Sequence, residues 1–378
     1  RSRAHPRPGH NGNMSDPRAV GMDPAGLEQA ADLVRQRGRP AQLVVVRHGQ
    51  VVLDRWFGVA PTSILYLFSA SKAFATVSML QLIERGLVDL DAPVATYWPA
   101  YGGGGKSDVT IRQVMCHRSG MATGNGWTLL GRMLRHAVVM PSWRASLRRI
   151  ERARLVWPPG EVPAYQWLAY GYVLGEVAQR VTGRTYEDLV SSELLHPLGM
   201  TNTYLRIGRD LRARFVPVRM DGRFGKLVAR AINNPMTLRR VAPSAGITTT
   251  ARDLARFYTM LAAGGTLNGR TYLSSTTLAA ATQPTSLGYV DQLMGEATRW
   301  ATGFQLGGPR GIPGTFSPMG RSSSPTTFGH NGSHACMGWA DPSRGLAFAH
   351  LANQPGMRRA DVAHQADVAD AVLAACRD

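Results

Sequence analysis

Ser69 and Lys72 stand in the S-x-x-K pattern. A serine hydroxyl is a weak nucleophile near neutral pH and needs a base beside it. A lysine amine serves as that base when burial or a neighbouring cation lowers its pKa. Apolar residues recur at helical spacing over residues 71–84, and residues three apart on a helix share one face. The pattern alone also fits an ordinary surface serine and lysine, but this context predicts a nucleophile at a helix entrance.

Tyr165 is the second candidate, because it lies just before a predicted helix over residues 170–181. A phenol held partly ionised by Lys72 would relay a proton between Ser69 and a leaving group. The alternative is an aromatic side chain that only fills the core.

The third candidate is the run His330, Asn331, Gly332 and Ser333, which lies in the strand-rich end of the chain. A glycine at a strand edge lets a substrate carbonyl approach the backbone, where the N–H groups of Ser333 and Ser69 would form an oxyanion hole. The alternatives are a plain Asn-Gly hairpin turn and a hydrogen-bonded core histidine.

The elements that position these groups follow from residue periodicity. Asp23 and Pro24 begin a predicted helix that stops at Gly38, and two β-branched runs at residues 43–47 and 51–57 predict a hairpin. The middle of the chain is mostly helical, with loops rich in glycine and proline. Strand patterns return near the end and precede a closing helix, at residues 300–306, 326–330, 333–340, 345–353 and 360–376 respectively.

This order predicts an α+β fold, with an antiparallel sheet flanked by helices and built from both ends of the chain. We expect residues 22–90 and 291–378 to form the sheet domain and residues 91–290 to form a mostly helical inserted domain. Residues 1–21 are expected to be a disordered arm or a segment added by cloning.

The net charge of +18 raises the question of a nucleic-acid partner. The 40 arginines are scattered except between Arg132 and Arg154, and they are not interleaved with aromatic residues as in a stacking platform. We therefore expect no nucleic-acid partner. The chain has three cysteines and ten histidines, none at metal-ligand spacing, so neither a metal nor an organic cofactor is expected.

No stretch of 18 or more apolar residues is free of charge, and the first 13 residues lack the apolar segment of a signal peptide. The sequence therefore predicts a cytoplasmic protein, and a signal cleaved before Arg1 is left open.

Five segments in the same order resemble the serine β-lactamase and penicillin-binding-protein superfamily: residues 67–74, 109–120, 197–203, 246–254 and 328–332. The likeness extends from about residue 22 to residue 376, and the closer match is to the class C β-lactamase-like esterases called family VIII carboxylesterases. The resemblance implies a β-lactamase/transpeptidase-like fold and a serine hydrolase.

The resemblance also implies roles for individual residues. Ser69 would be acylated, and Lys72 and Tyr165 would share the proton transfers. The backbone N–H groups of Ser69 and Ser333 would hold the oxyanion. His330 would occupy the place of the lysine in the K-T-G motif of β-lactamases, and related esterases often have histidine there.

Two departures from the family pattern bear on the substrate. The Y-x-N motif is here Tyr165-Gln166-Trp167, and Trp167 cannot accept a hydrogen bond as the asparagine amide would. His330 is mostly neutral near pH 7 without a partner, unlike the lysine that it replaces. Both changes weaken recognition of a penicillin carboxylate, so His330, Asn331, Gly332 and Trp167 are predicted to bind a different acyl substrate.

The sequence therefore favours hydrolysis of a small carboxylic ester through a Ser69 acyl-enzyme. The alternatives are an acyltransferase that uses the same site, a β-lactamase or D,D-peptidase, and a catalytically inactive binding protein on this fold. The arginines from Arg132 to Arg154 are either a solvated helix face or a docking surface for an acidic carrier protein or an anionic lipid.

Overall fold

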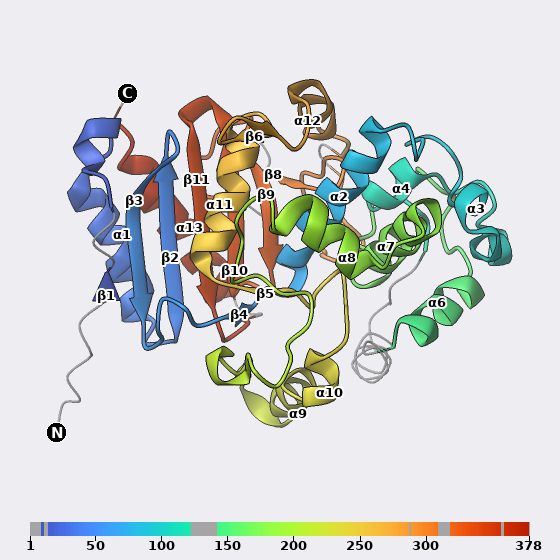
Figure 1. The fold of residues 1–378 in the computed structure, drawn as a ribbon, viewed down its shortest axis with the longest axis horizontal. Coiled ribbons are helices and arrows are strands. Elements are labelled where there is room, and N and C mark those ends of the chain that lie inside the picture. The colour runs from blue at the N-terminus through green and yellow to red at the C-terminus, as the bar shows by residue number, and fades with distance from the viewer. Residues whose placement is uncertain are drawn as a thin grey trace.

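The computed structural model describes residues 9–10, 14–121, 142–286, 289–308, 318–356 and 359–377. At its centre is a seven-stranded sheet with the order β1-β3-β2-β11-β10-β9-β8, in which all neighbours are antiparallel (Figure 1). The strands are β1 (Gly9–His10), β2 (Ala41–Arg47), β3 (Gln50–Phe57), β8 (Gln305–Leu306), β9 (Phe328–Gly332), β10 (Cys336–Asp341) and β11 (Leu346–Ala352).

The two ends of the chain meet in this sheet. Strands β2 and β3 form the predicted hairpin, and His48 and Gly49 turn the chain between them with positive φ angles of 48° and 78°. Strand β11 pairs with β2 over seven consecutive residue pairs, from Leu346 opposite Arg47 to Ala352 opposite Ala41. The predicted antiparallel sheet built from both ends of the chain is thus confirmed.

Helices cover both faces of the sheet. On one face lie α1 (Pro24–Gln36) and α13 (Arg359–Ala374), which pack against each other, and on the other lies α11 (Ala251–Ala262) (Figure 1). Side chains alternate along a strand, so Leu43 and Val45 enter the core beneath α1 and α13 while Val44 and Val46 enter the larger core. This two-sided burial explains why β2 is a continuous apolar run.

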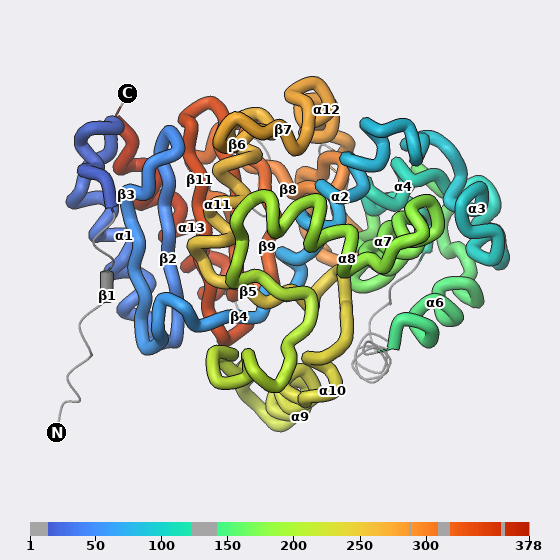
Figure 2. Tube along the Cα trace, in the orientation of Figure 1, coloured from blue at the N-terminus to red at the C-terminus, as the bar shows by residue number. Residues whose placement is uncertain are grey.

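The rest of the chain is mostly helical. Figure 2 follows it from β4 into α2 and through the helices at the right of the view, then back through α9 and α10 to β5 and α11. The helices are α2 (Lys72–Glu84), α3 (Val94–Tyr97), α4 (Ile111–Met115), α6 (Trp143–Arg152), α7 (Ala169–Thr182), α8 (Tyr186–Val190), α9 (Gly222–Ile232), α10 (Pro235–Leu238) and α12 (Ser275–Ala281). Two short strand pairs complete it: β4 (Leu65–Tyr66) with β5 (Thr248–Thr249), and β6 (Thr266–Leu267) with β7 (Arg270–Thr271).

Two local predictions differ from the structure. The strand expected over residues 300–306 is reduced to β8, because the chain turns back where the Ala301 N–H donates to the Phe304 carbonyl and Gly303 has a φ of 85°. The arm expected over residues 1–21 is also partly ordered, where the structure describes it. Strand β1 pairs with β3, and the Ser15 N–H donates to the Val51 carbonyl.

The division into a sheet domain and an inserted helical domain stays a prediction. Helix α11 belongs by sequence to residues 91–290, yet it packs on β11 and β10. Helix α2 belongs to residues 22–90, yet it packs on α7. One continuous core joins these elements. Within the described part of the chain, no helix has the length and apolar character needed to cross a membrane.

Candidate active site

Ser69 sits at a sharp turn between a strand and a helix. Strand β4 is held against β5, and the Leu67 N–H donates to the Ile247 carbonyl. Phe68 then has a φ of 50°, a left-handed conformation that costs a residue with a side chain roughly 1–2 kcal/mol. The 3₁₀ helix η2 (Phe68–Ser71) follows and runs into α2. The turn places Ser69 at the helix entrance, as the sequence predicted.

Lys72 is the first residue of α2 and is fully buried. Its Nζ lies 3.4 Å from Ser69 Oγ and 3.3 Å from the Ser244 carbonyl oxygen, both neutral groups. Burial lowers the pKa of the Lys72 amine well below its usual value, because removal from water penalises the charged form. A neutral amine beside a hydroxyl can accept its proton.

Ser244 fixes the lysine from the opposite side. Its Oγ accepts a hydrogen bond from the Gly171 N–H at 2.7 Å and donates one to the Leu168 carbonyl at 2.9 Å. A Cβ on Gly171 would lie 2.6 Å from the Ser244 nitrogen, so only glycine allows this approach of α7. The start of α7 thus positions the carbonyl that holds Lys72.

Tyr165 lies against both Lys72 and Ser69. Lys72 Nζ is 4.7 Å from the centre of the Tyr165 ring. Burial raises the pKa of the Tyr165 phenol, and a hydrogen bond with the Ser69 side chain opposes that shift. The Tyr165 ring stacks on Trp300 with ring centres 5.4 Å apart. The structure thus brings together the three groups that the sequence selected for proton transfer.

Asp291 anchors the Tyr165 segment although it is 126 residues away in sequence. Its Oδ1 accepts from the Tyr165 backbone N–H at 3.1 Å, and its Oδ2 accepts from Trp300 Nε1 at 3.0 Å. Burial raises the pKa of this carboxyl, and backbone N–H donors oppose the shift. Asp291 therefore holds both partners of the aromatic stack in place.

His117 closes the site on a further side. Its ring lies edge-on to Tyr165, with ring centres 4.8 Å apart, and its Nδ1 accepts from the Gln166 N–H at 3.2 Å. Burial lowers the pKa of His117 well below its usual value, and nearby Lys72 adds to the shift. A neutral His117 therefore packs against the phenol and fixes the backbone next to it. Trp167, two residues after Tyr165, is half-buried.

Strand β9 brings the predicted run His330–Ser333 to the nucleophile turn. A Cβ on Gly332 would lie 2.1 Å from the Leu67 carbonyl oxygen and 3.3 Å from the Ala70 nitrogen. Glycine therefore lets β9 approach the turn that carries Ser69, and the oxyanion hole predicted from the Ser69 and Ser333 N–H groups stays a prediction. Ser333 follows Gly332 with a φ of 50° and turns the chain away from the strand.

The His330 ring lies 6.2 Å from Tyr165 and 6.2 Å from Trp300, measured between ring centres. Burial lowers its pKa to about 3, with a further contribution from Lys72. His330 Nδ1 lies 2.8 Å from the Asn331 carbonyl oxygen, while Nε2 is buried without a hydrogen-bond partner among the described residues. His330 is therefore a neutral ring near pH 7.

Asn331 differs from its neighbours because its side chain forms hydrogen bonds within the protein. Its Oδ1 accepts from the His334 N–H, and its Nδ2 donates to Gln365 Oε1 of helix α13. Its backbone N–H donates to Gln305 Oε1 at 2.8 Å. These bonds hold the turn after β9, so a contact between the Asn331 side chain and a substrate stays a prediction.

Sequence reasoning selected Ser69, Lys72 and Tyr165 but did not select Ser244, His117, Asp291 or Trp300. His117 lies within the segment 109–120, which carried the family resemblance. That segment could have indicated that His117 belongs to the site. Asp291 and Trp300 had no comparable signal.

The remaining predictions concern metals and the arginine-rich segment. In the part of the chain that the structure describes, no three His, Cys, Asp or Glu side chains gather as metal ligands would. Arg132 and Arg135 lie outside the described residues. Within α6, Arg144, Arg148 and Arg152 are exposed at four-residue intervals.

A serine hydroxyl, a buried lysine amine with a lowered pKa and a phenol, on an antiparallel sheet flanked by helices, define a serine hydrolase of the β-lactamase/transpeptidase type. The model of the Beta-lactamase family matches residues 28–372, so this chain belongs to that family. The predicted family and fold are thereby confirmed.

Two curated relatives are similar in sequence. The chain is 29% identical over 352 residues to the Esterase/beta-lactamase LipL of Mycobacterium tuberculosis, which covers 82% of this chain and 76% of that protein. It is 28% identical over 212 residues to Esterase EstB of Burkholderia gladioli, which covers 49% of this chain and 53% of that protein.

Solved structures share the fold. A penicillin-binding-protein homologue from Caulobacter crescentus superposes with a TM-score of 0.75 and 25% identity, over 94% of this chain and 99% of that one. A family VIII carboxylesterase superposes with a TM-score of 0.75 and 23% identity, over 91% and 96% of the two chains. The similarity extends over both the sheet and the helical region.

Proposed function

We propose that the protein is a carboxylesterase that forms an acyl-enzyme on Ser69. The observation that carries the proposal is the buried Lys72 amine, 3.4 Å from Ser69 Oγ and contacting only neutral oxygens among its hydrogen-bond partners. A nucleophile needs such a base, and a lysine kept neutral by burial supplies one.

In the first half of the reaction, the Ser69 hydroxyl gives its proton to Lys72 Nζ and Oγ attacks the ester carbonyl carbon. The carbonyl oxygen becomes an oxyanion, which the backbone N–H groups of Ser69 and Ser333 stabilise. The carbon–oxygen bond to the leaving group then breaks, and Tyr165 passes a proton from Lys72 to the departing alkoxide. The products are an alcohol and an acyl group on Ser69.

In the second half, water gives a proton to the same base and its oxygen attacks the acyl carbon. The bond to Ser69 Oγ breaks, Oγ recovers a proton from Lys72, and a carboxylic acid leaves. Both halves use the same groups in opposite directions, so the active site needs no further cofactor for this chemistry.

Two features support an ester rather than a β-lactam as the substrate. His330 is neutral because burial lowers its pKa to about 3, and a neutral imidazole gives a substrate carboxylate much weaker attraction than a lysine. Gln166 is fully buried and donates to Ser119, so its amide does not take the place of the asparagine in the Y-x-N motif. The name of the relative EstB, an esterase, points the same way, whereas LipL is named as both an esterase and a β-lactamase.

Acyl transfer is the second candidate, because the acyl-enzyme can react with an alcohol in place of water. A Monacolin J acid methylbutanoyltransferase of Aspergillus terreus is 26% identical over 235 residues, or 52% of this chain and 56% of that protein. Adding a short alcohol to the ester assay distinguishes the two: transfer raises the yield of the new ester, while hydrolysis alone gives only the acid.

The test is intact-protein mass spectrometry after exposure to a fluorophosphonate probe, combined with turnover of short p-nitrophenyl esters. We expect one adduct on the wild type, none on Ser69→Ala, and at least a thousandfold loss of turnover in that variant. Ser71→Ala is the matched control, since Ser71 lies two residues away and its Oγ only accepts from the Ile247 N–H. A wild-type protein without an adduct, or a Ser69→Ala variant that keeps its turnover, would overturn the proposal.

A further inference from the structure

A strongly basic unit lies at one edge of the molecule, apart from the active site. Helices α9 and α10, with the loop before them, form residues 219–240, hereafter the α9–α10 unit (Figure 1). It carries six cationic side chains and one carboxylate, a net charge of +5: Arg219, Arg223, Lys226, Arg230, Arg239 and Arg240 against Asp221. The role in ester hydrolysis proposed above uses none of them.

The unit is joined to the chain that follows strand β11. Asn353, next to β11, donates through Nδ2 to the Pro217 carbonyl at 2.9 Å and accepts from the Arg219 N–H through its own carbonyl at 3.0 Å. Gln354 donates to the one acidic side chain, Asp221, at 3.1 Å. Asp221 is thus the single counter-charge within the unit, and it balances only one of the six cations.

The exposed face of α9 is a single stripe. Arg223, Lys226, Leu227 and Arg230 are all exposed, and their spacing of three and four residues places them on one side of a helix. In the described part of the chain, none of these three cations has a hydrogen bond or ion pair through its side chain. Exposed arginines elsewhere do form pairs, as Arg112 does with Asp91.

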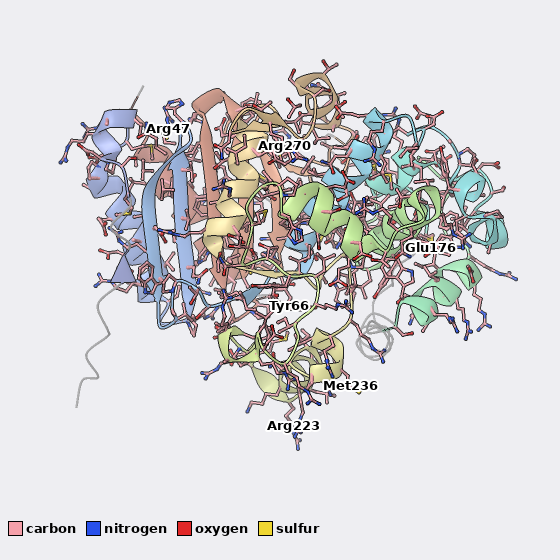
Figure 3. All side chains as sticks on the ribbon, in the orientation of Figure 1. Arg47, Tyr66, Glu176, Arg223, Met236 and Arg270 are labelled. Carbon is pink, nitrogen blue, oxygen red and sulfur yellow. The ribbon has the colours of Figure 1, made fainter. Side chains whose placement is uncertain are left out.

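Two large apolar side chains stand out within this basic face. Leu227 is 53% exposed and Met236 is 63% exposed, the latter at the start of α10. Figure 3 labels Arg223 and Met236 on the unit, at the edge of the molecule that points away from the sheet. Exposed aliphatic side chains among several cations are typical of helices that lie on an anionic lipid surface.

A groove beside the stripe supplies a place for a headgroup. It has a volume of about 800 Å³, and Arg219, Lys226 and Arg230 line it together with Met220 and Asp221. In its wall, both ends of the Asn233 amide bond the Val218 backbone, and Asn234 Oδ1 accepts from the Met236 N–H. The groove thus offers three cations against one carboxylate, Asp221, and such cationic side chains bind phosphate groups well.

We infer that the α9–α10 unit docks the protein on an anionic phospholipid surface. Arg219, Lys226 and Arg230 would contact phosphate groups, while Leu227 and Met236 would enter the acyl boundary. The inference does not rest on the proposed esterase activity, because binding is measured without turnover.

The test is co-sedimentation of the 378-residue protein with vesicles, in about 0.1 M salt. We expect binding to vesicles of phosphatidylcholine with a quarter phosphatidylglycerol, and none to phosphatidylcholine alone. Binding should weaken as salt is raised, because exposed charges are screened within about 10 Å at this ionic strength. A wild-type protein that ignores the anionic vesicles would overturn the inference and leave an acidic protein as the partner of this face.

Matched variants assign the surface. Arg230→Glu should lower vesicle affinity about tenfold or more. Arg270→Glu makes the same charge change at the opposite edge of the molecule and should leave affinity unchanged within about twofold (Figure 3). The double variant Leu227→Gln, Met236→Gln should lose affinity even at low salt. Equal losses in the Arg230 and Arg270 variants would show that net charge alone drives binding and would overturn the assignment.

Two further readouts keep the outcome clear. Unchanged turnover of a soluble ester by Arg230→Glu would show that the variant is folded. Glycerol 1-phosphate added at the same phosphate concentration as the lipid should not displace the vesicles. Displacement would show a small-anion site in the groove and would overturn the docking of a surface.

Discussion

Two buried polar clusters lie near the turn after β9. One contains a basic group whose hydrogen-bond partners are all neutral, and the other contains oppositely charged side chains that pair with each other. In the active site, the Lys72 amine contacts the neutral oxygens of Ser69 and Ser244. On the other face of the sheet lies a group that we call the paired cluster: Arg37, Arg39, Asp361, His334, His350 and His364. There Asp361 accepts from both arginines.

The difference in charge pairing indicates a different role for each cluster. A buried charge with a partner remains ionised and holds elements together, whereas a buried amine without one gives up its proton. The histidines of the paired cluster are neutral, since burial lowers the pKa of His350 to about 3 and that of His364 to about 4. We therefore expect the paired cluster to matter for stability and the active site to matter for turnover.

The largest effect is expected for Lys72→Met, which keeps the shape of the side chain and removes the base. Ester turnover, as kcat/KM, should fall at least a thousandfold. The free energy of unfolding at pH 7 should rise by roughly 1–3 kcal/mol, because an apolar group replaces a buried amine. Urea denaturation and steady-state kinetics measure the two effects.

The pH dependence of that stability follows from the lowered pKa of Lys72. Between this pKa and the unfolded value of about 10.4, the unfolded chain binds one more proton, so wild-type stability falls as pH falls through this window. The Met variant should lose this dependence. Lys226→Met on the surface is the control and should change neither quantity; a Lys72→Met variant with wild-type turnover would contradict the role of base.

The reverse pattern is expected for Asp361→Asn in the paired cluster. Removing the carboxylate leaves Arg37 and Arg39 without their partner, so the free energy of unfolding should fall by about 2–4 kcal/mol. Turnover of the folded variant should stay within about threefold of wild type. Asp32→Asn, which breaks the exposed pair with Arg35, is the control and should cost less than about 1 kcal/mol.

Gly332→Ala tests the strand that the two clusters share. The added Cβ would lie 2.1 Å from the Leu67 carbonyl oxygen, so β9 must move away from the Ser69 turn. We expect kcat/KM to fall by roughly tenfold to a hundredfold because the Ser333 N–H is displaced from the oxyanion. Gly102→Ala, whose Cβ meets nothing closer than 3.5 Å, is the control; equal losses in both would contradict this account.

The smallest effect is expected for His330→Gln. With a pKa of about 3, His330 is already neutral across pH 5–9, so its loss should change kcat/KM by less than about fivefold. The profile of kcat/KM against pH should rise through the lowered pKa of Lys72 in wild type and variant alike, because the neutral amine is the active form. An acid limb that vanishes in His330→Gln would identify His330 as the titrating base.

Local patterns predicted much of the fold. The β2–β3 hairpin follows from two β-branched runs around His48-Gly49, and α1 follows from Asp23-Pro24 and Gly38. These patterns depend only on residues that are close in sequence, so they can be recognised without the fold. Strand β8 was overestimated because Trp300, before it, makes only isolated bridges to Ser286 and Gln305, and the chain turns at Ala301 and Gly303.

The sequence by itself determined the pairing of Ser69 with Lys72, because a spacing of three residues at a helix start fixes their distance. It also determined the family, through five segments in order. Only the tertiary structure decided that the pKa of Lys72 is lowered, since its burial depends on Ser244 and on α7, far along the chain. Only the tertiary structure likewise placed Tyr165, which Asp291 holds from 126 residues away. Burial and long-range hydrogen bonds are properties of the folded chain, and they set the pKa values on which the proposed chemistry depends.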